Sequence, residues 1–392
     1  MIEATSTLRP DPLELASGMV LGADSAHPPL PEPDGRGPRD ALRDALARAL
    51  QAQPCLLQFS GGRDSSCALA LAVRVAREEG LQLPIPITYR WPEAPEVDES
   101  RWQELVVRHL GLKEWTRLEF AQEMDYVGPI ARRAVSKVGV IWPPNGYMLL
   151  PALEAAAGGS LITGMDGDGL FLWRWSQAVN LLLRRDAISA PGAKNLLAYL
   201  APSPVARIAD GRRTLHPIPW LLAEPRREVL RRWAAQRAAE PKRWDKRIHF
   251  YNKLRYVAVL RWGGDLLAST CRTQLLHLFM DPQFLSNLAS ADGATGFATR
   301  TAAMKSLFED LLPTAILERA DKPVFHVYWG EHSRRAVDEW QGGDVDPAIV
   351  DSDALRQEWT SRYPSFMSAM LLQSVSSGKG TDLEQPLEGR GK

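Results

Sequence analysis

Cysteine is scarce in this chain, and neither sign of charge is in excess. The 392 residues include three cysteines, Cys55, Cys67 and Cys271, and no Cys-x-x-Cys pair. This argues against a disulfide scaffold and against a zinc site of the usual Cys/His spacing. Lysine plus arginine and aspartate plus glutamate both number 47, so the formal net charge is zero. Proteins that attract nucleic acid non-specifically usually carry a basic excess, so nucleic acid is not the expected partner.

Long hydrophobic runs are missing as well. No apolar run reaches the roughly 18 residues that a membrane-spanning helix needs. Residues 1–12 lack the basic stretch and apolar core of a signal peptide. We therefore expect a cytoplasmic protein with no membrane partner. Its composition, with 45% hydrophobic and 24% charged residues, is that of an ordinary globular protein.

Composition divides the chain into four segments. Residues 1–44 are rich in Pro, Gly and Asp and predict a loosely ordered, partly disordered extension. Residues 375–392 are polar and Gly-rich, as is typical of a disordered tail. Between them we expect the main domain over residues 45–335 and a helical segment over residues 336–374.

The first half of the chain alternates between strand and helix patterns. Strands are expected over residues 55–59, 84–89, 115–120 and 160–163. The helices between them are expected over residues 64–79, 98–110, 121–138 and 147–157. Such alternation predicts right-handed βαβ units and a parallel sheet. After Phe171 the strand signals fade, and helices are expected over residues 224–239, 251–261, 266–279 and 302–312. The prediction is an α/β fold with a helical C-terminal layer.

A seven-residue loop follows the first expected strand and opens the first long helix: Ser60, Gly61, Gly62, Arg63, Asp64, Ser65 and Ser66. Its glycines let backbone N–H groups approach phosphate oxygens, and the helix N-terminus adds partial positive charge. The Asp64 carboxylate would repel phosphate unless Mg²⁺ lies between them. No Walker A pattern occurs, which argues against transfer of the γ-phosphate. The alternative is a Gly-Gly turn whose Ser and Asp merely cap the helix.

A second motif follows the fourth expected strand and reads Thr163-Gly164-Met165-Asp166-Gly167-Asp168-Gly169-Leu170-Phe171. Ligands of open α/β sheets bind at the carboxyl ends of parallel strands, where this motif is expected to lie. Both motifs would therefore meet at one edge of the sheet. The alternative is a turn rich in Gly and Asp that binds nothing.

The phosphate loop resembles that of the N-type ATP pyrophosphatases. Its surroundings, roughly residues 45–335, resemble the synthetase domain of asparagine synthetases, β-lactam synthetases and lasso-peptide cyclases. The resemblance implies a PP-loop (adenine nucleotide α-hydrolase-like) fold that cleaves ATP between its α- and β-phosphates. By position in the family pattern [ST]-G-E-G-x-D-E-L-F, Asp168 takes the metal-binding role, so Asp64 and Asp168 would hold Mg²⁺. The residues it implies for ATP binding are Ser60, Gly61, Gly62, Asp64, Ser65, Ser66, Thr163 and Gly164.

Two departures from the family pattern matter in the second motif. Met165 and Gly169 stand where the family has glutamates. Met165 cannot accept a proton. Another group must therefore deprotonate the nucleophile, or the nucleophile must arrive neutral. Asp166 is the neighbouring carboxylate that could take over this role.

A third stretch, from Arg300 to Phe325, resembles the family's K-x-x-L-R-x-x-x-x-x-x-L-P…R-x-x-K-x-x-F. Counting back from Leu312-Pro313, the family lysine falls on Thr301, which cannot supply the positive charge that the departing pyrophosphate needs. We expect Lys305 first, and Arg300 second, to supply it. The alternative for both is a solvated helix start. Asp98-Glu99-Ser100 also resembles the family, which often has Asp-Glu at this helix start, but the preferred interpretation is a favourable charge pattern at the start of a helix.

The expected function is that of an ATP-dependent amide-forming ligase. A small-molecule or peptide carboxylate would be adenylated, and an amine donor would then take the acyl group. Only 54 residues precede the first expected strand, so we expect no glutaminase domain in this chain. A separate precursor peptide or amidotransferase is therefore a candidate partner.

Two other functions stay open. Met165, Gly169 and Thr301 also suit an ATP-binding but catalytically degenerate partner or regulator. The arginine-rich stretch over residues 226–247 is the one sign of nucleic-acid modification, and the charged face of a surface helix looks the same.

Overall fold

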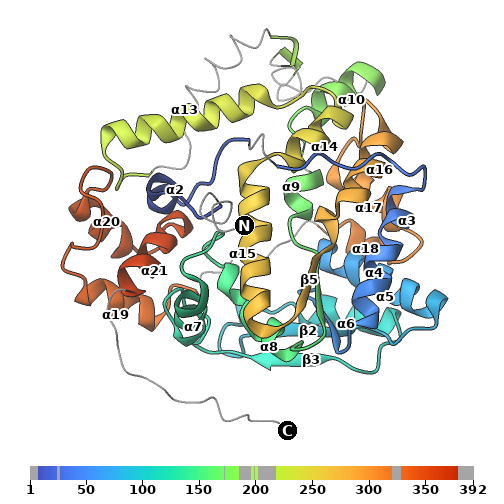
Figure 1. Ribbon diagram of the computed structural model, residues 1–392, viewed down its shortest axis with the longest axis horizontal. Helices are drawn as coiled ribbons and strands as arrows, with labels where there is room; N and C mark the ends of the chain where they lie inside the picture. The colour runs from blue at the N-terminus through green and yellow to red at the C-terminus, as the bar shows by residue number, and fades with distance from the viewer. Residues whose placement is uncertain are drawn as a thin grey trace.

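The computed structural model describes residues 8–23, 27–171, 173–184, 196–197, 199–201, 218–319 and 328–377 (Figure 1). These residues form a five-stranded sheet in the order β3-β2-β1-β4-β5. Every neighbouring pair of its strands is parallel. The strands are β1 Cys55–Gln58, β2 Ile85–Arg90, β3 Thr116–Glu119, β4 Ser160–Thr163 and β5 Gln274–His277. The α/β fold with a parallel sheet, as expected for a PP-loop domain, is confirmed.

Helices precede, separate and follow the strands. Those of the first half are α2 Pro12–Ser17, α3 Pro38–Ala41, α4 Arg43–Gln51, α5 Arg63–Glu79, α6 Ser100–His109, α7 Pro129–Val138 and α8 Leu150–Ala155. From there to the end of the sheet region come α9 Gly167–Phe171, α10 Ser176–Arg184, α13 Ala223–Ala239, α14 Trp244–Asn252 and α15 Arg255–Cys271. The last ones are α16 Pro282–Asp292, α17 Arg300–Phe308, α18 Thr314–Leu317, α19 Glu331–Glu339, α20 Ser352–Trp359 and α21 Ala369–Ser377. No helix in the described part of the chain is long and apolar enough to cross a membrane.

The direction of strand addition reverses between β1 and β4. From β1 the chain moves outward to β2 and β3, and it then returns to add β4 and β5 on the other side. Gln58 at the end of β1 lies opposite Thr163 at the end of β4. A crevice opens at such a switch point because the two following segments leave toward opposite faces of the sheet. The phosphate loop follows β1 and the second motif follows β4, so the fold brings them together at this point.

Strand β5 corrects the sequence prediction. A helix was expected over residues 266–279, but α15 ends at Cys271 and Arg272 takes a left-handed conformation, with φ of 53°. The chain then runs straight into β5. A short apolar run such as Leu275-Leu276 suits a buried helix and a strand equally, so periodicity could not separate them. The helical C-terminal layer therefore also supplies one edge of the sheet.

The N-terminal region is also more ordered than its composition suggested. Helix α2 begins with a capping box in which Asp11 and Glu14 each bond the other's backbone N–H. The buried Glu14 carboxylate pairs with Arg255 on α15 at 2.6 Å. Pro28 and Pro31 accept hydrogen bonds from side chains of the main domain. The structure thus corrects the expectation of a loosely ordered extension for residues 8–23 and 27–44, because their polar groups are tied to the core.

The C-terminal helices pack on this N-terminal region. Helices α2, α19, α20 and α21 lie on the same side of the molecule (Figure 1). They share a hydrophobic cluster that contains three buried tryptophans, Trp220, Trp340 and Trp359. Trp220 Nε1 donates to the carbonyl of Ala16 in α2 at 2.7 Å. Residues 375–377 of the expected tail belong to α21, and residues 378–392 lie outside the described residues. The expected segment boundaries at residues 45, 335 and 374 remain predictions.

One hydrophobic core joins the two halves of the chain. Leu57 of β1 and Leu69 of α5 share it with Trp244 of α14, Phe279 after β5 and Phe284 of α16. Each of these side chains is at most 1% exposed. The second half is therefore packed on the sheet and does not form an independent fold.

Candidate active site

The phosphate loop turns sharply between β1 and α5. Gly62 is the N-cap of α5 and has extended backbone angles, so the helix starts at Arg63. Gly61 has φ of +84°, and a Cβ there would come within 2.9 Å of the Gln103 side chain. Glycine is required at residue 61 both for its conformation and for space. The result is a helix N-terminus whose first N–H groups lie in an open loop.

The loop serines do not play identical parts. The hydroxyl of Ser65 lies 3.0 Å from that of Ser60 and accepts from the Ser60 backbone N–H at 3.2 Å. Ser60 Oγ in turn accepts from the Gly62 N–H at 3.3 Å. Ser66 is completely buried, and its hydroxyl has no hydrogen-bond partner among the described residues. Without a nucleotide, the hydrogen bonds of Ser60 and Ser65 stabilise the conformation of the loop.

A buried ion pair that the sequence analysis missed supports the loop from α6. Arg319, whose side chain is 3% exposed, forms a two-pronged pair with Glu99. Its Nη1 also donates to the carbonyl of Gly61 at 3.0 Å. Glu99 thus holds Arg319 against the loop, a role beyond the helix-start pattern. Asp98 does act at the helix start, where it accepts from the Ser100 backbone N–H. The available signal was that Glu99 and Arg319 both fall in stretches that resemble the family; Lys322 and Phe325 of that stretch lie outside the described residues.

The two carboxylates predicted to hold a metal ion converge on one guanidinium. Arg300 Nη2 lies 2.6 Å from Asp64 Oδ2, and Arg300 Nη1 pairs with Asp168. Gly167 lies so close that a Cβ there would come within 2.5 Å of the Asp64 carboxyl group. Glycine at residue 167 therefore makes room for Asp64. The structure brings Asp64, Asp168 and Arg300 together, and the metal-binding and charge-stabilising roles expected for them remain predictions.

The same pair of carboxylates fits a magnesium ion. Mg²⁺ is commonly held by one or two carboxylates, with the remaining ligands coming from substrate phosphates and water. No group of three or more His, Cys, Asp or Glu side chains forms a metal cluster in the part of the chain that the structure describes. Asp64 and Asp168 already face one cation, the Arg300 guanidinium, which stands in for the charge that a metal ion would supply. The donor set suits an ion that arrives with a nucleotide.

Positive charge reaches this site from residues other than Lys305. Lys305 Nζ pairs with Glu318 Oε1 at 2.5 Å, and both side chains are more than one-third exposed. Five residues along a helix turn a side chain by about 140°, which directs Lys305 away from Arg300. The structure does not bring Lys305 to the carboxylate pair, whereas Arg300 lies beside both carboxylates. The role of Lys305 remains a prediction.

Arg63 is the second cation of the site and was not predicted. Its Nη1 donates to the hydroxyl of Thr301 at 3.0 Å, so it lies beside the position where the family carries a lysine. Burial, together with the neighbouring positive charge of Arg300, lowers the pKa of Arg63. A guanidinium nevertheless stays charged at neutral pH. The contact between α5 and α17 thus places a cation next to Thr301.

Asp166 is held by two tyrosines. Its Oδ2 accepts hydrogen bonds from the hydroxyls of Tyr251, at 2.5 Å, and Tyr256, at 3.2 Å. Burial raises the pKa of Asp166 to about 6, although both tyrosine bonds act to lower it. Asp166 has φ of +63°, a left-handed conformation that aspartate tolerates better than most residues. A side chain at Gly169 would collide with the Asp166 carboxylate and the Tyr256 hydroxyl. The departure at residue 169 therefore makes room for Asp166.

The end of β4 lies directly against the start of α5. A Cβ at Gly164 would come within 2.8 Å of the Asp64 backbone, so only glycine permits this approach. Thr163 Oγ1 lies 2.7 Å from Nδ1 of the buried His277 at the end of β5. Burial lowers the pKa of His277 to about 4, with Arg261 adding to the effect. His277 is therefore neutral at pH 7 and orients Thr163 without adding charge to the site.

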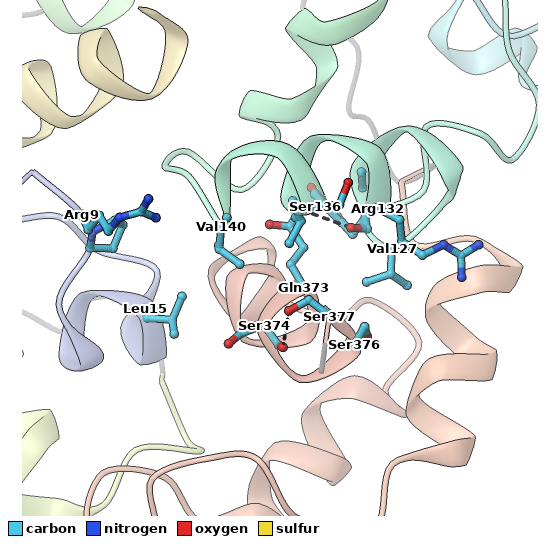
Figure 2. A pocket seen from close by; sticks show the side chains of 15 residues that line it. Arg9, Leu15, Val127, Arg132, Ser136, Val140, Gln373, Ser374, Ser376 and Ser377 are labelled. Carbon is cyan, nitrogen blue, oxygen red and sulfur yellow. Dashed lines mark hydrogen bonds between the residues drawn. The ribbon is translucent and has the colours of Figure 1, made fainter. Parts of the chain in front are cut away.

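A separate cavity of about 530 Å³ lies between α2, α7 and α21 (Figure 2). Arg9, Leu15, Val127 and Gln373 are among its lining residues, and none of the lining residues belongs to the phosphate loop or to the motif after β4. Geometry and chemistry, and not the presence of this cavity, therefore locate the candidate active site.

Two comparisons with known proteins bear on the family of this chain. No curated protein matches the chain at a significant level. The sequence model of the asparagine synthase family, however, matches residues 37–373. That range is most of the chain and includes the phosphate loop, both carboxylates and Arg319. The protein belongs to the asparagine synthase family.

Proposed function

We propose that this protein is an ATP-dependent amide-forming ligase that releases AMP and pyrophosphate. A carboxylate oxygen of the acyl substrate attacks the α-phosphorus of ATP, and the bond from that phosphorus to the β-phosphate oxygen breaks. Pyrophosphate leaves. The amine nitrogen then attacks the acyl carbon, the bond to the AMP oxygen breaks, and the amine loses its proton to a base. The convergence of Asp64 and Asp168 beside the phosphate loop, in a member of the asparagine synthase family, carries this proposal.

The chain's own residues would act by holding phosphate and offsetting charge. Backbone N–H groups at the start of α5 bind phosphate oxygens. Arg63 and Arg300, which lie beside Thr301 and Asp64, would offset the negative charge that develops on the departing pyrophosphate. Arg300 would exchange its carboxylate partners for phosphate oxygens when ATP arrives. Bound Mg²⁺ would neutralise phosphate charge between Asp64 and Asp168. Preorganised charges of this kind contribute a few kcal/mol to a barrier reduction.

The substrates we propose are a peptide or another secondary-metabolite carboxylate and an amine, either in the same molecule or from a second one. The departures at Met165 and Gly169 support a chemistry other than glutamine-dependent asparagine synthesis. A precursor peptide or a separate amidotransferase is the partner that this chemistry would require.

The direct test is turnover with ATP, Mg²⁺ and a library of carboxylates and peptides, with pyrophosphate as the readout. We expect pyrophosphate release with one class of carboxylate, accompanied by an equal amount of AMP. Tight ATP binding without turnover for any carboxylate would contradict the proposal and favour an ATP-binding regulator.

Asp166 is the base that we propose for the amine proton, since Met165 cannot accept it. The Asp166→Asn variant should still exchange labelled pyrophosphate into ATP in the presence of the acyl substrate. Its rate of amide formation should fall about 100-fold, the usual contribution of a positioned base. Asp265→Asn, on the exposed side of α15, is the matched control and should leave both rates unchanged. Unaltered amide formation in Asp166→Asn would exclude this role.

A further inference from the structure

The cavity between α2, α7 and α21 takes no part in the chemistry proposed above (Figure 2). Its volume of about 530 Å³ lies within the range of sites for small molecules, roughly 300–1,000 Å³. Three of its lining residues, Arg9, Ser136 and Ser377, are exposed, so the cavity opens to solvent. A small ligand can therefore enter it from outside.

Much of the lining is apolar. The apolar wall of the cavity consists of Leu15, Val127, Ala131, Val135 and Val140. Small-molecule sites commonly combine such a wall with a few polar groups that fix the orientation of the ligand. The polar groups of this cavity therefore indicate which ligand it fits.

The charged groups of the lining are cationic. They are Arg9 and Arg132, and the lining contains no acidic side chain among the residues that the structure describes. Neither arginine forms an ion pair within the described ranges. Asp11 and Glu14, the acidic residues nearest to Arg9 in the chain, pair with arginines of α13 and α15 instead. An anionic group on a ligand would therefore complement the cavity.

Arg9 is held in a position to bind that anion. Its Nη1 donates to the carbonyl of Val138 at 3.2 Å, and its guanidinium lies 5.4 Å from the ring centre of Trp262. Figure 2 shows the Arg9 side chain extending from the side of α2 toward α7. A guanidinium has five N–H donors and binds a carboxylate through two parallel hydrogen bonds. With one donor used by Val138, enough remain for a carboxylate.

Gln373 adds an unused hydrogen-bond acceptor. Its side chain is 4% exposed, and its Nε2 donates to the carbonyls of Tyr126 at 3.2 Å and Pro144 at 2.9 Å. Because both partners are carbonyls, they fix which end of the amide is the nitrogen. No described residue donates to Gln373 Oε1, and this oxygen is not sealed inside the protein. Since Gln373 lines the cavity, an N–H group of a ligand would satisfy its Oε1.

A ligand that matches the whole lining carries a carboxylate, an amide N–H and an apolar body. A fatty acid lacks the N–H group, and a nucleotide lacks the apolar body. We infer that this cavity binds the C-terminal end of an apolar peptide, with the terminal carboxylate on Arg9, a backbone N–H on Gln373 and the side chains against the apolar wall. Capture of a terminal carboxylate is a recurring mode of peptide recognition. This inference goes beyond the proposed function and does not depend on it.

The experiment measures binding of N-acetyl-leucyl-leucine to the full chain by titration calorimetry, without ATP. We expect one saturable site for the free acid and at least about tenfold weaker binding of its C-terminal amide, which lacks the carboxylate. Decanoate keeps a carboxylate and an apolar chain but has no N–H group, so it should also bind at least about tenfold more weakly. Equal binding of the acid and the amide, or decanoate binding as tight as that of the dipeptide, would overturn the inference.

Three variants locate the site. Arg9→Met should weaken binding of the free acid about tenfold and leave binding of the amide unchanged. Arg133→Met is the matched control, because Arg133 lies outside the lining and pairs with Glu154 at the surface; it should change the affinity less than about twofold. Val135→Trp fills the cavity and should abolish binding.

Thermal unfolding checks that each variant is folded. Equal weakening by Arg9→Met and Arg133→Met would show that general charge explains binding, and undiminished binding by Val135→Trp would place the ligand elsewhere. Either result contradicts the inference. Because ATP is absent, failure here leaves the ligase proposal intact.

Discussion

Replacing Asp64 with asparagine should reduce ATP-dependent pyrophosphate release by about 100-fold or more. The change keeps the size of the side chain but removes the charge that faces Arg300 at 2.6 Å. It also removes one of the two carboxylates that suit Mg²⁺. The first residues of α5 and the contact with Gly167 should persist, so the variant should fold.

Two measurements separate this role from a structural one. ATP binding by the wild-type chain should strengthen when Mg²⁺ is added, and binding by Asp64→Asn should depend far less on Mg²⁺. Asp310→Asn is the matched control, because Asp310 pairs with Arg39 and Arg74 at the surface. It should keep wild-type turnover. Wild-type pyrophosphate release by Asp64→Asn would remove Asp64 from the mechanism.

Breaking the ion pair between Glu99 and Arg319 should have the largest effect on stability. Both side chains are nearly buried, at 11% and 3% exposure, so Glu99→Ala leaves a guanidinium without its carboxylate. Loss of one partner from a buried pair costs about 3–5 kcal/mol of unfolding free energy. The surface pair Lys305–Glu318 is the matched control, and Lys305→Ala should cost at most about 1 kcal/mol. Urea unfolding measures both.

A double replacement distinguishes stability from loop positioning. Glu99→Leu/Arg319→Met should recover much of the lost stability, because apolar side chains of similar size often replace a buried ion pair without cost. ATP affinity should nevertheless stay reduced, since the bond from Arg319 to the Gly61 carbonyl is gone. Equal and small losses for the buried and the surface pair would contradict the role we assign to Arg319.

The sequence predicted the parts of the site that are local in the chain. The phosphate loop and the motif after β4 each combine a strand end with glycines. The structure shows that a side chain at Gly61 or Gly164 would collide with its neighbours. Both motifs also follow neighbouring parallel strands, so their meeting followed from topology. That is why Asp64 and Asp168 were predicted together.

The parts that failed depend on contacts between distant segments. Arg63 reaches Thr301 across 238 residues, and Arg319 reaches Glu99 across 220 residues. A pattern within a short stretch of sequence cannot show that two residues this far apart in the chain are in contact. Lys305 was favoured by its place in a motif, but the helix rotation between it and Arg300 decides which cation faces the site. Strand β5 was missed because a short apolar run fits a strand or a helix.

The position of bond cleavage in ATP tests the central claim most directly. The protein is incubated with Mg²⁺, the carboxylate that supports turnover and ATP labelled at its α-phosphorus, and the labelled products are separated. Our account predicts that all released label appears in AMP or an acyl-adenylate, with one pyrophosphate per turnover and none in Asp64→Asn. Labelled ADP with inorganic phosphate as the main product would contradict it.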